Sequence, residues 1–136
     1  MIKPHGADTL KPLYVSDAAE RARLTAEAAN LPALLISSAA AGNAVMLAAG
    51  YFTPLNGFMN LADSLSVAEK LHTTDGLFWP VPIVNVVKDI STINGAKRIA
   101  LRDPNVDGNP VLAIMDIAAI DEASDEQMCF MAEKIF

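Results

Sequence analysis

Cysteine and histidine are scarce in this chain, and their scarcity excludes several kinds of site. Among 136 residues there is one cysteine, Cys129, so no internal disulfide can form and a cysteine-rich zinc site is excluded. The two histidines, His5 and His72, are far apart in sequence and are interpreted as ordinary surface or turn residues, so we expect no metal site. A single thiol suits a reducing compartment, and the first six residues lack the apolar core of a signal peptide. We therefore expect a cytoplasmic location.

Charged residues are also few, and they are unevenly placed. They make up 19% of the chain, with 10 basic against 16 acidic side chains and a net charge of −6, which disfavours nucleic-acid binding. The one basic group, Lys97, Arg98 and Arg102, fits either an anion or partner-domain contact or a solvated strand face. No charged residue occurs from Ala28 to Ala62, but prolines and glycines interrupt this stretch, so we expect no membrane span.

The motifs that mark catalytic sites are missing. Neither phosphate-binding glycine pattern, G-x-x-x-x-G-K-S/T or G-x-G-x-x-G, is present. Cys129 has no adjacent histidine and is interpreted as a structural thiol. Asp103, Asp107 and Asp116 do not match a calcium-binding loop, and the first two are typical turn formers. We expect no catalytic, cofactor-binding or metal-binding residue in this chain.

Helix signals dominate the first half and strand signals the second, which predicts one α+β domain over residues 1–136. Capping side chains precede the expected helices, and the last of them pairs Ser124 with Gln127. The expected helices run from Asp17 to Ala29, from Ala39 to Ala49 after Ser38, from Asn60 (with Leu61, Leu65 and Ala68 on one face) to the turn at 73–76, and from Ser124 onward. The expected strands are 34–36, 81–87, 98–102 (half-exposed) and 111–117, with a turn at 103–110.

The last helix has apolar residues on more than one side. Met128, Met131, Ala132 and Ile135 form a stripe, and Cys129, Phe130 and Phe136 lie off it. Such a helix needs two partners, so we expect an exposed apolar patch there and self-association of the chain. No terminator follows Phe136, and we expect the chain to be cut within a longer protein.

The segment from Gly50 to Asn60 links the second and third helices. Gly50 and Gly57 are expected to have positive φ. Pro54, Leu55, Phe58 and Met59 are expected to form a structural plug between these helices, with the three large apolar side chains largely buried in the core or against a partner.

This segment, GYFTPLNGFMN, resembles the G-x-F-x-P-L-x-G-F-M motif of the ATP sulfurylases, or sulfate adenylyltransferases. The ordered segments around it are similar to that family too, across essentially all 136 residues: the opening MIKPHG, GLFWPVPI at 76–83, RIALRDP at 98–104 and GNPVLA at 108–113. The likeness is greater to the single-function bacterial enzymes than to forms fused to a kinase.

The resemblance implies an N-terminal domain with a PUA-like pseudo-barrel fold. It also implies a parent enzyme that converts ATP and sulfate to adenosine 5′-phosphosulfate and pyrophosphate with Mg²⁺. The family's catalytic marks, a Q-x-R-N-P segment and a His-x-x-His pair, do not occur in this chain, so no catalytic residue can be assigned. The implied partners are the catalytic nucleotidyltransferase domain, absent from this chain, and further copies in a homo-oligomer. A free-standing PUA-like RNA-binding module and a solitary structural domain are the alternatives.

Overall fold

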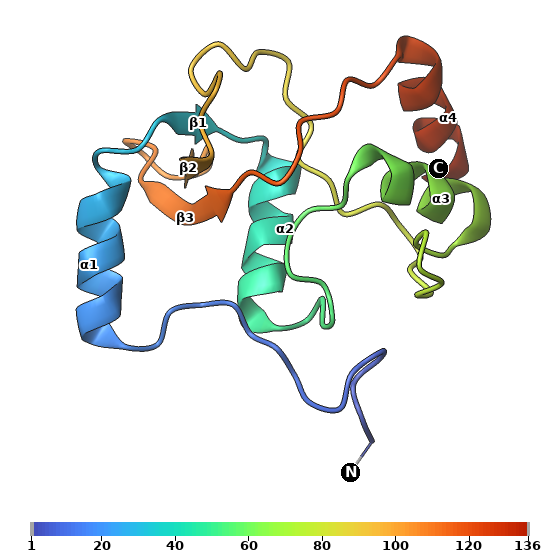
Figure 1. Ribbon diagram of the computed structural model, residues 1–136, viewed down its shortest axis with the longest axis horizontal. Coiled ribbons are helices and arrows are strands. Elements are labelled where there is room, and N and C mark those ends of the chain that lie inside the picture. The colour runs from blue at the N-terminus through green and yellow to red at the C-terminus, as the bar shows by residue number, and fades with distance from the viewer. Residues whose placement is uncertain (1, 136) are drawn as a thin grey trace. The chain divides into compact units, whose positions relative to one another are not determined.

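The computed structural model describes residues 2–135, and these form two compact units. The sheet unit comprises residues 2–57 and 85–118. The helix unit comprises residues 58–84 and 119–135. The chain enters the helix unit twice, and each unit is described by itself (Figure 1).

The sheet unit is built on three strands, β1 (Ala33–Leu35), β2 (Arg98–Arg102) and β3 (Val111–Asp116), in the order β1-β2-β3. β2 pairs in parallel with β1 and antiparallel with β3. The middle residues of β2 are buried on both faces, so the expectation of a half-exposed strand is wrong. Because β2 is the central strand, the small side chain of Ala100 is buried as completely as Ile99 on the opposite face.

Two helices of the sheet unit, α1 (Ala18–Ala28) and α2 (Ser38–Ala49), pack against β3, and Figure 1 shows the strand between them. Asp17 caps α1 as expected, since its carboxylate accepts from the backbone N–H of Glu20 at 2.7 Å. The cap of α2 is Ser37, not Ser38. Ser37 has the extended backbone that a cap requires, whereas the hydroxyl of Ser38 donates to Asn105 at 2.7 Å.

The expected strand at 81–87 does not form. Its residues are strongly β-prone, but Pro80 and Pro82 cannot donate to a ladder, and no neighbouring strand among residues 2–135 pairs with the segment. One backbone bond holds it within the helix unit, from the N–H of Met59 to the carbonyl of Ile83 at 2.7 Å. Ile83 is 2% exposed and anchors the segment by burial.

The helix unit contains α3 (Leu61–Lys70) and α4 (Asp125–Ile135), which pack against each other. Asn60 caps α3 as expected. The helix ends at Leu71, whose φ is +58°, and not at the turn 73–76. The most buried face is also displaced from the expected stripe of Leu61, Leu65 and Ala68: it consists of Ser64, Val67 and Ala68, and both leucines are half-buried.

Ser124 and Gln127 form the predicted reciprocal cap of α4, with bonds of 2.9 and 3.2 Å. The apolar stripe is buried only over its first part: Met131 is buried and Met128 half-buried, while Ala132 and Ile135 are exposed. Phe136 lies outside the described residues.

In the segment between α2 and α3, Gly50 has the predicted left-handed conformation, with φ of +82°. The φ of Gly57 lies outside the left-handed region, so the prediction of a positive φ there is wrong. Leu55, Phe58 and Met59 are half-buried and not largely buried as expected.

Candidate functional site

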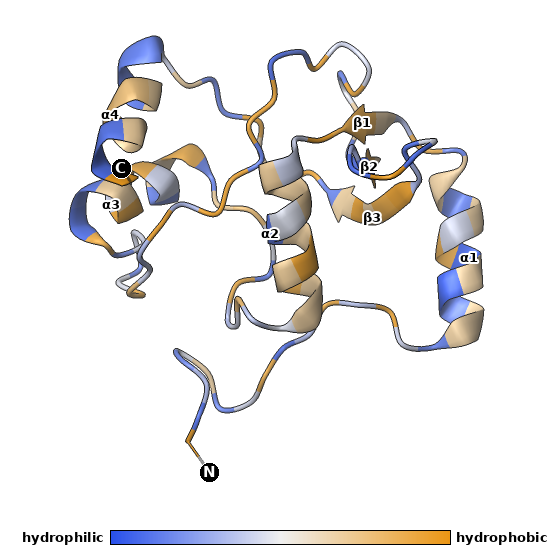
Figure 2. Cartoon of the chain, turned by 180° about the vertical axis from the view of Figure 1, so that it is seen from behind, coloured by the Kyte–Doolittle hydropathy of each residue, from blue (hydrophilic) through white to orange (hydrophobic). Residues whose placement is uncertain are grey.

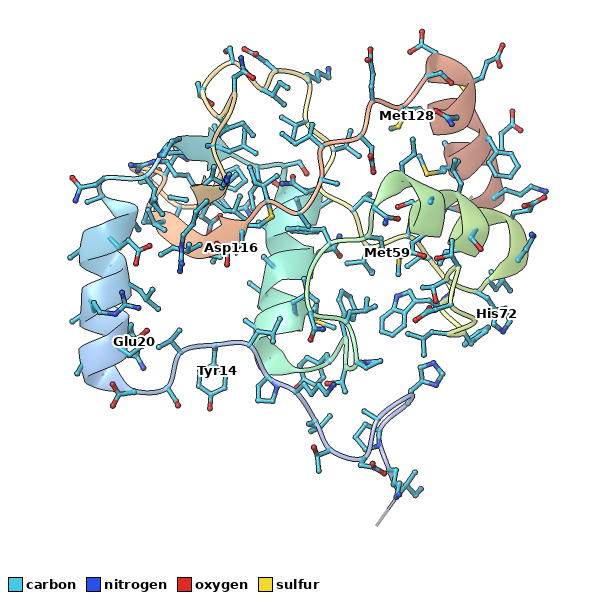
Figure 3. The ribbon with its side chains drawn as sticks, in the orientation of Figure 1. Tyr14, Glu20, Met59, His72, Asp116 and Met128 are labelled. Carbon is cyan, nitrogen blue, oxygen red and sulfur yellow. The ribbon has the colours of Figure 1, made fainter. Side chains whose placement is uncertain are left out.

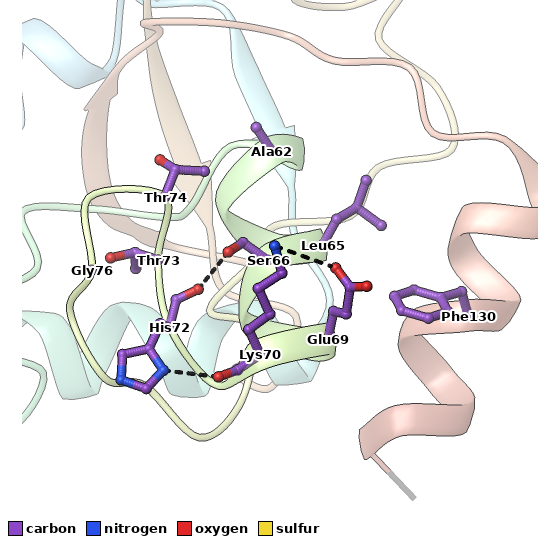
Figure 4. A pocket seen from close by; sticks show the side chains of 10 residues that line it. All are labelled: Ala62, Leu65, Ser66, Glu69, Lys70, His72, Thr73, Thr74, Gly76 and Phe130. Atoms are coloured by element: carbon purple, nitrogen blue, oxygen red, sulfur yellow. Dashed lines mark hydrogen bonds and ion pairs between the residues drawn. The ribbon is translucent and has the colours of Figure 1, made fainter.

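A hollow of about 640 Å³ lies beside α3 in the helix unit (Figure 4). α3, the loop after it and one aromatic residue of α4 form its wall. No sequence motif marks this hollow, because packing alone brings these parts together. Its lining residues are Ala62, Leu65, Ser66, Glu69, Lys70, His72, Thr73, Thr74, Gly76 and Phe130.

Polar groups that line this hollow bond to one another and to nearby backbone carbonyls. The hydroxyl of Ser66 donates to the carbonyl of His72 at 2.7 Å. Nδ1 of His72 lies 2.8 Å from the carbonyl of Lys70, which can only accept, so Nδ1 is protonated and donates. Lys70 and Glu69 form an exposed ion pair at 3.9 Å, which contributes little. Ser66 gives its proton to a carbonyl and not to a base, so its hydroxyl is not activated as a nucleophile.

The loop that follows α3 is held by the same kind of bonds. One carboxylate oxygen of Asp63 accepts from the backbone N–H of Thr74 at 2.8 Å and from its hydroxyl at 2.7 Å. The hydroxyl of Thr73 donates to Asp75, and Gly76 completes the turn with φ of +92°. These carboxylates and hydroxyls stabilise a turn, which accounts for their positions without a ligand.

A second hollow, of about 400 Å³, lies at the start of α3. The N-terminus of a helix attracts anions, but here the protein supplies the anion itself. Oδ2 of Asp121 accepts from the backbone N–H of Leu61 at 3.0 Å, and the side chain of Asn60 accepts from the backbone N–H of Asp63 at 2.8 Å. The start of α3 is therefore already capped by side chains of the helix unit, and a carboxylate stands where a phosphate or sulfate would bind.

The two arginines of the basic group, Arg98 and Arg102, form contacts within the sheet unit. Arg98 Nε lies 3.0 Å from Glu27 Oε1 and 3.6 Å from Asp116 Oδ1, so it joins α1 to the sheet. Arg102 donates to the carbonyl of Asn109 at 3.0 Å and closes the turn between β2 and β3. These contacts lie within the sheet unit. They support neither an anion or partner-domain contact nor a fully solvated strand face for the two arginines.

The other candidate residues lie apart from one another. They include the turn residue Asp103, which accepts from Asn105 at 2.8 Å as expected for a turn former. Over residues 2–135, no group of three or more histidine, cysteine or acidic side chains is close enough to hold a metal ion. The remaining candidates are exposed: Lys97, His5, Cys129 on α4, and Asp107 in the turn.

The clear pKa shifts also lie away from the hollows. A hydrogen bond from Arg23 lowers the pKa of Glu20, and the same pair raises the pKa of Arg23. Bonds from the backbone and hydroxyl of Ser91 lower the pKa of Asp89. All three groups are on the surface, as Figure 3 shows for Glu20 on α1, so these shifts reflect local pairing and not a catalytic environment.

The described residues do not fit ATP or Mg²⁺. A phosphate chain needs convergent N–H groups and cations, and Mg²⁺ needs carboxylates that converge on one point. The sites described above offer neither arrangement: Arg98 faces Glu27, Arg102 donates to the carbonyl of Asn109, and Asp121 occupies the start of α3. Within residues 2–135, no helix has both the length and the apolar character needed to cross a bilayer.

Comparison with known proteins indicates the family of this chain, which the geometry of the hollows does not. The chain is 65% identical over its full length to a sulfate adenylyltransferase of Alcanivorax borkumensis and 56% identical to that of Allochromatium vinosum, and it spans 34% of each. A solved structure, a hexameric APS kinase from Thiobacillus denitrificans, superimposes with a TM-score of 0.72 at 32% identity, over 90% of this chain and 24% of that one.

These relatives confirm the resemblance drawn from the GYFTPLNGFMN motif and its ordered neighbours. The chain spans about one third of the length of the sulfate adenylyltransferases it matches. The profile of the PUA-like domain matches residues 2–135, and the α+β content agrees with the fold expected from the sequence. The chain therefore belongs to the PUA-like domain family.

Proposed function

We propose that this chain is the N-terminal, PUA-like domain of a cytoplasmic sulfate adenylyltransferase. The parent enzyme is a nucleotidyltransferase that joins ATP and sulfate into adenosine 5′-phosphosulfate and pyrophosphate, with Mg²⁺. The observation that supports this most is full-length identity of 65% to such an enzyme, of which the chain spans 34%. Two thirds of the parent polypeptide, including the catalytic domain, then lie outside this sequence.

Within that enzyme the domain serves as a structural module. Sulfate is a weak nucleophile, so its attack on phosphorus requires cations and N–H donors around the phosphates of ATP. The two hollows offer few of them: Lys70 is the only lysine or arginine in either lining, with Glu69 beside it, and Asp121 occupies the start of α3. The chain also has a net charge of −6. Packing against the catalytic domain and shaping a homo-oligomer are the roles that remain, and the similarity to a hexameric protein supports the second.

The test compares the 136-residue chain with the parent enzyme. Sulfate-dependent pyrophosphate release from ATP is expected from the parent and not from the chain. Release by the purified chain above a buffer control would refute the structural role. An inactive, folded parent would refute the assignment to this enzyme. A gel shift of RNA by the chain that persists at physiological salt would favour the RNA-binding alternative instead.

A further inference from the structure

α2 is uncharged on every side, and this distinguishes it from the other helices. Its sequence, SAAAGNAVMLAA, contains no acidic or basic residue, and it lies inside the charge-free stretch from Ala28 to Ala62. Figure 2 shows α2 mostly in white and orange, whereas α1 has blue segments. A helix that is apolar all round is normally covered on all sides.

Within the sheet unit, α2 is covered by β3 along one side and by residues 12–14 at its C-terminal end. Ala40, Ala41 and Leu47 are buried on the side where the helix packs against β3. Positions 42, 45, 46 and 49 recur at helical spacing on another side and are exposed. Val45 is 53% and Met46 37% exposed.

Two exposed tyrosines are bonded through their backbones to the last turns of the helix. The backbone N–H of Tyr14 donates to the carbonyl of Ala48 at 3.2 Å, and that of Tyr51 donates to the carbonyl of Met46 at 3.0 Å. Their side chains are 60% and 73% exposed. Tyr14 projects away from the ribbon in Figure 3. We call the four exposed positions of the helix, Gly42, Val45, Met46 and Ala49, the α2 face.

We propose that the α2 face is the docking surface for the remainder of the parent polypeptide. This inference rests on the proposed function, which places two thirds of the enzyme outside this sequence. A tethered segment binds at high effective concentration, so a modest apolar patch is enough to hold it. Gly42 and Ala49 have little or no side chain, which lets a partner backbone approach closely.

A second copy of the chain is a poorer occupant of the same surface. Each copy has a net charge of −6, so association of two free copies works against electrostatic repulsion. Free association also costs translational and rotational entropy that a tethered segment does not lose. We therefore assign the α2 face to a contact within one polypeptide.

The test measures the accessibility of this surface by alkylation. Val45→Cys and Ala49→Cys are made separately in a Cys129→Ser background, in the 136-residue chain and in the parent enzyme. The rate of maleimide labelling at each site is followed by mass spectrometry of the labelled peptide. The matched control is Ala22→Cys on the exposed, charged side of α1. We expect labelling at 45 and 49 to be about tenfold or more slower in the parent, with the control rate similar in both proteins.

Each outcome of the labelling experiment supports or overturns the docking surface. Equal labelling rates at 45 and 49 in chain and parent would overturn it, even if the parent is an active adenylyltransferase. Slow labelling already present in the 136-residue chain that disappears on dilution would assign the surface to a second copy and also overturn it. Protection in a parent that lacks adenylyltransferase activity would uphold the docking surface and remove only the proposed enzyme.

A second variant separates docking from folding. Val45→Asp places a charge on the α2 face without touching the side packed on β3. We expect the circular dichroism and urea midpoint of the 136-residue chain to stay unchanged, while the parent enzyme loses thermal stability. The same loss in both proteins would contradict a docking role, because it would show that Val45 matters within the domain alone.

Discussion

Gly50→Ala tests how the N-terminal segment is held against α2. Gly50 ends the helix with φ of +82°, a conformation that costs a side-chain-bearing residue about 1–2 kcal/mol. A Cβ at this position would also lie 3.1 Å from the backbone nitrogen of Pro12 and 3.2 Å from its Cα. Backbone atoms cannot rotate away as a flexible side chain can, so the segment around Pro12 would have to shift.

That shift would weaken the bonds around Pro12. The backbone N–H groups of Leu13 and Tyr14 donate to Ala48 at 3.0 and 3.2 Å, and that of Lys11 donates to the hydroxyl of Thr53 at 2.9 Å. Each such bond contributes about 0.5–1.5 kcal/mol. Together with the conformational cost, Gly50→Ala is expected to lower the free energy of unfolding by about 2–4 kcal/mol.

Urea unfolding followed by circular dichroism measures this loss, and two other glycines separate its causes. Gly108 has φ of +81° and open space where a Cβ would stand, so Gly108→Ala should cost only the conformational part, about 1–2 kcal/mol. Gly57 has open space and no positive φ, so Gly57→Ala should change stability by less than about 1 kcal/mol. Equal losses for Gly50→Ala and Gly108→Ala would refute the contribution of the close approach to Pro12.

Three further predictions concern single polar groups. Thr53→Val removes a buried hydroxyl that makes two backbone bonds, and should lower the urea-derived free energy by about 1–3 kcal/mol; an unchanged value would show that water replaces it. Asp121→Ala leaves the N–H of Leu61 without its carboxylate and should cost about 1 kcal/mol, whereas no loss would show that this cap is dispensable. Because bonds from Ser91 lower the pKa of Asp89, its small stabilising effect is present above the ordinary aspartate pKa and is lost as the pH falls through the lowered value. The difference in urea midpoint between wild type and Asp89→Asn should therefore shrink below about pH 4, and a difference that persists there would contradict this origin.

The helix ends could be predicted because their signals are local. Asp17, Asn60 and the Ser124–Gln127 pair each bond to backbone within three residues, so the sequence contains the whole interaction. Gly50 likewise marks a left-handed helix end without reference to the rest of the fold. The exchange of Ser37 for Ser38 shows the limit, because adjacent serines offer the same chemistry and only backbone geometry selects between them.

The strands depended on information that the sequence does not contain locally. Residues 81–87 are rich in β-branched side chains, whereas 98–102 have only an alternating pattern, but only the second segment finds partners, on both sides. A strand exists through its neighbours, so propensity alone overcounts strands and misjudges which face is buried. The hollow beside α3 could not be predicted for the same reason, because its wall includes Phe130 of α4, which is far from α3 in sequence.

The composition of α2 points to a constraint outside the helix itself. Lysine and glutamate form helices almost as well as alanine, so their absence from the exposed positions 42, 45, 46 and 49 is not explained by helix formation. Solubility would favour charges there, as on the outer side of α1. A membrane would explain an uncharged helix, but α2 has only 12 residues, too few to cross one. An uncharged surface is therefore best explained by a protein segment that covers it, since a buried charge on that face would have to be desolvated without a partner.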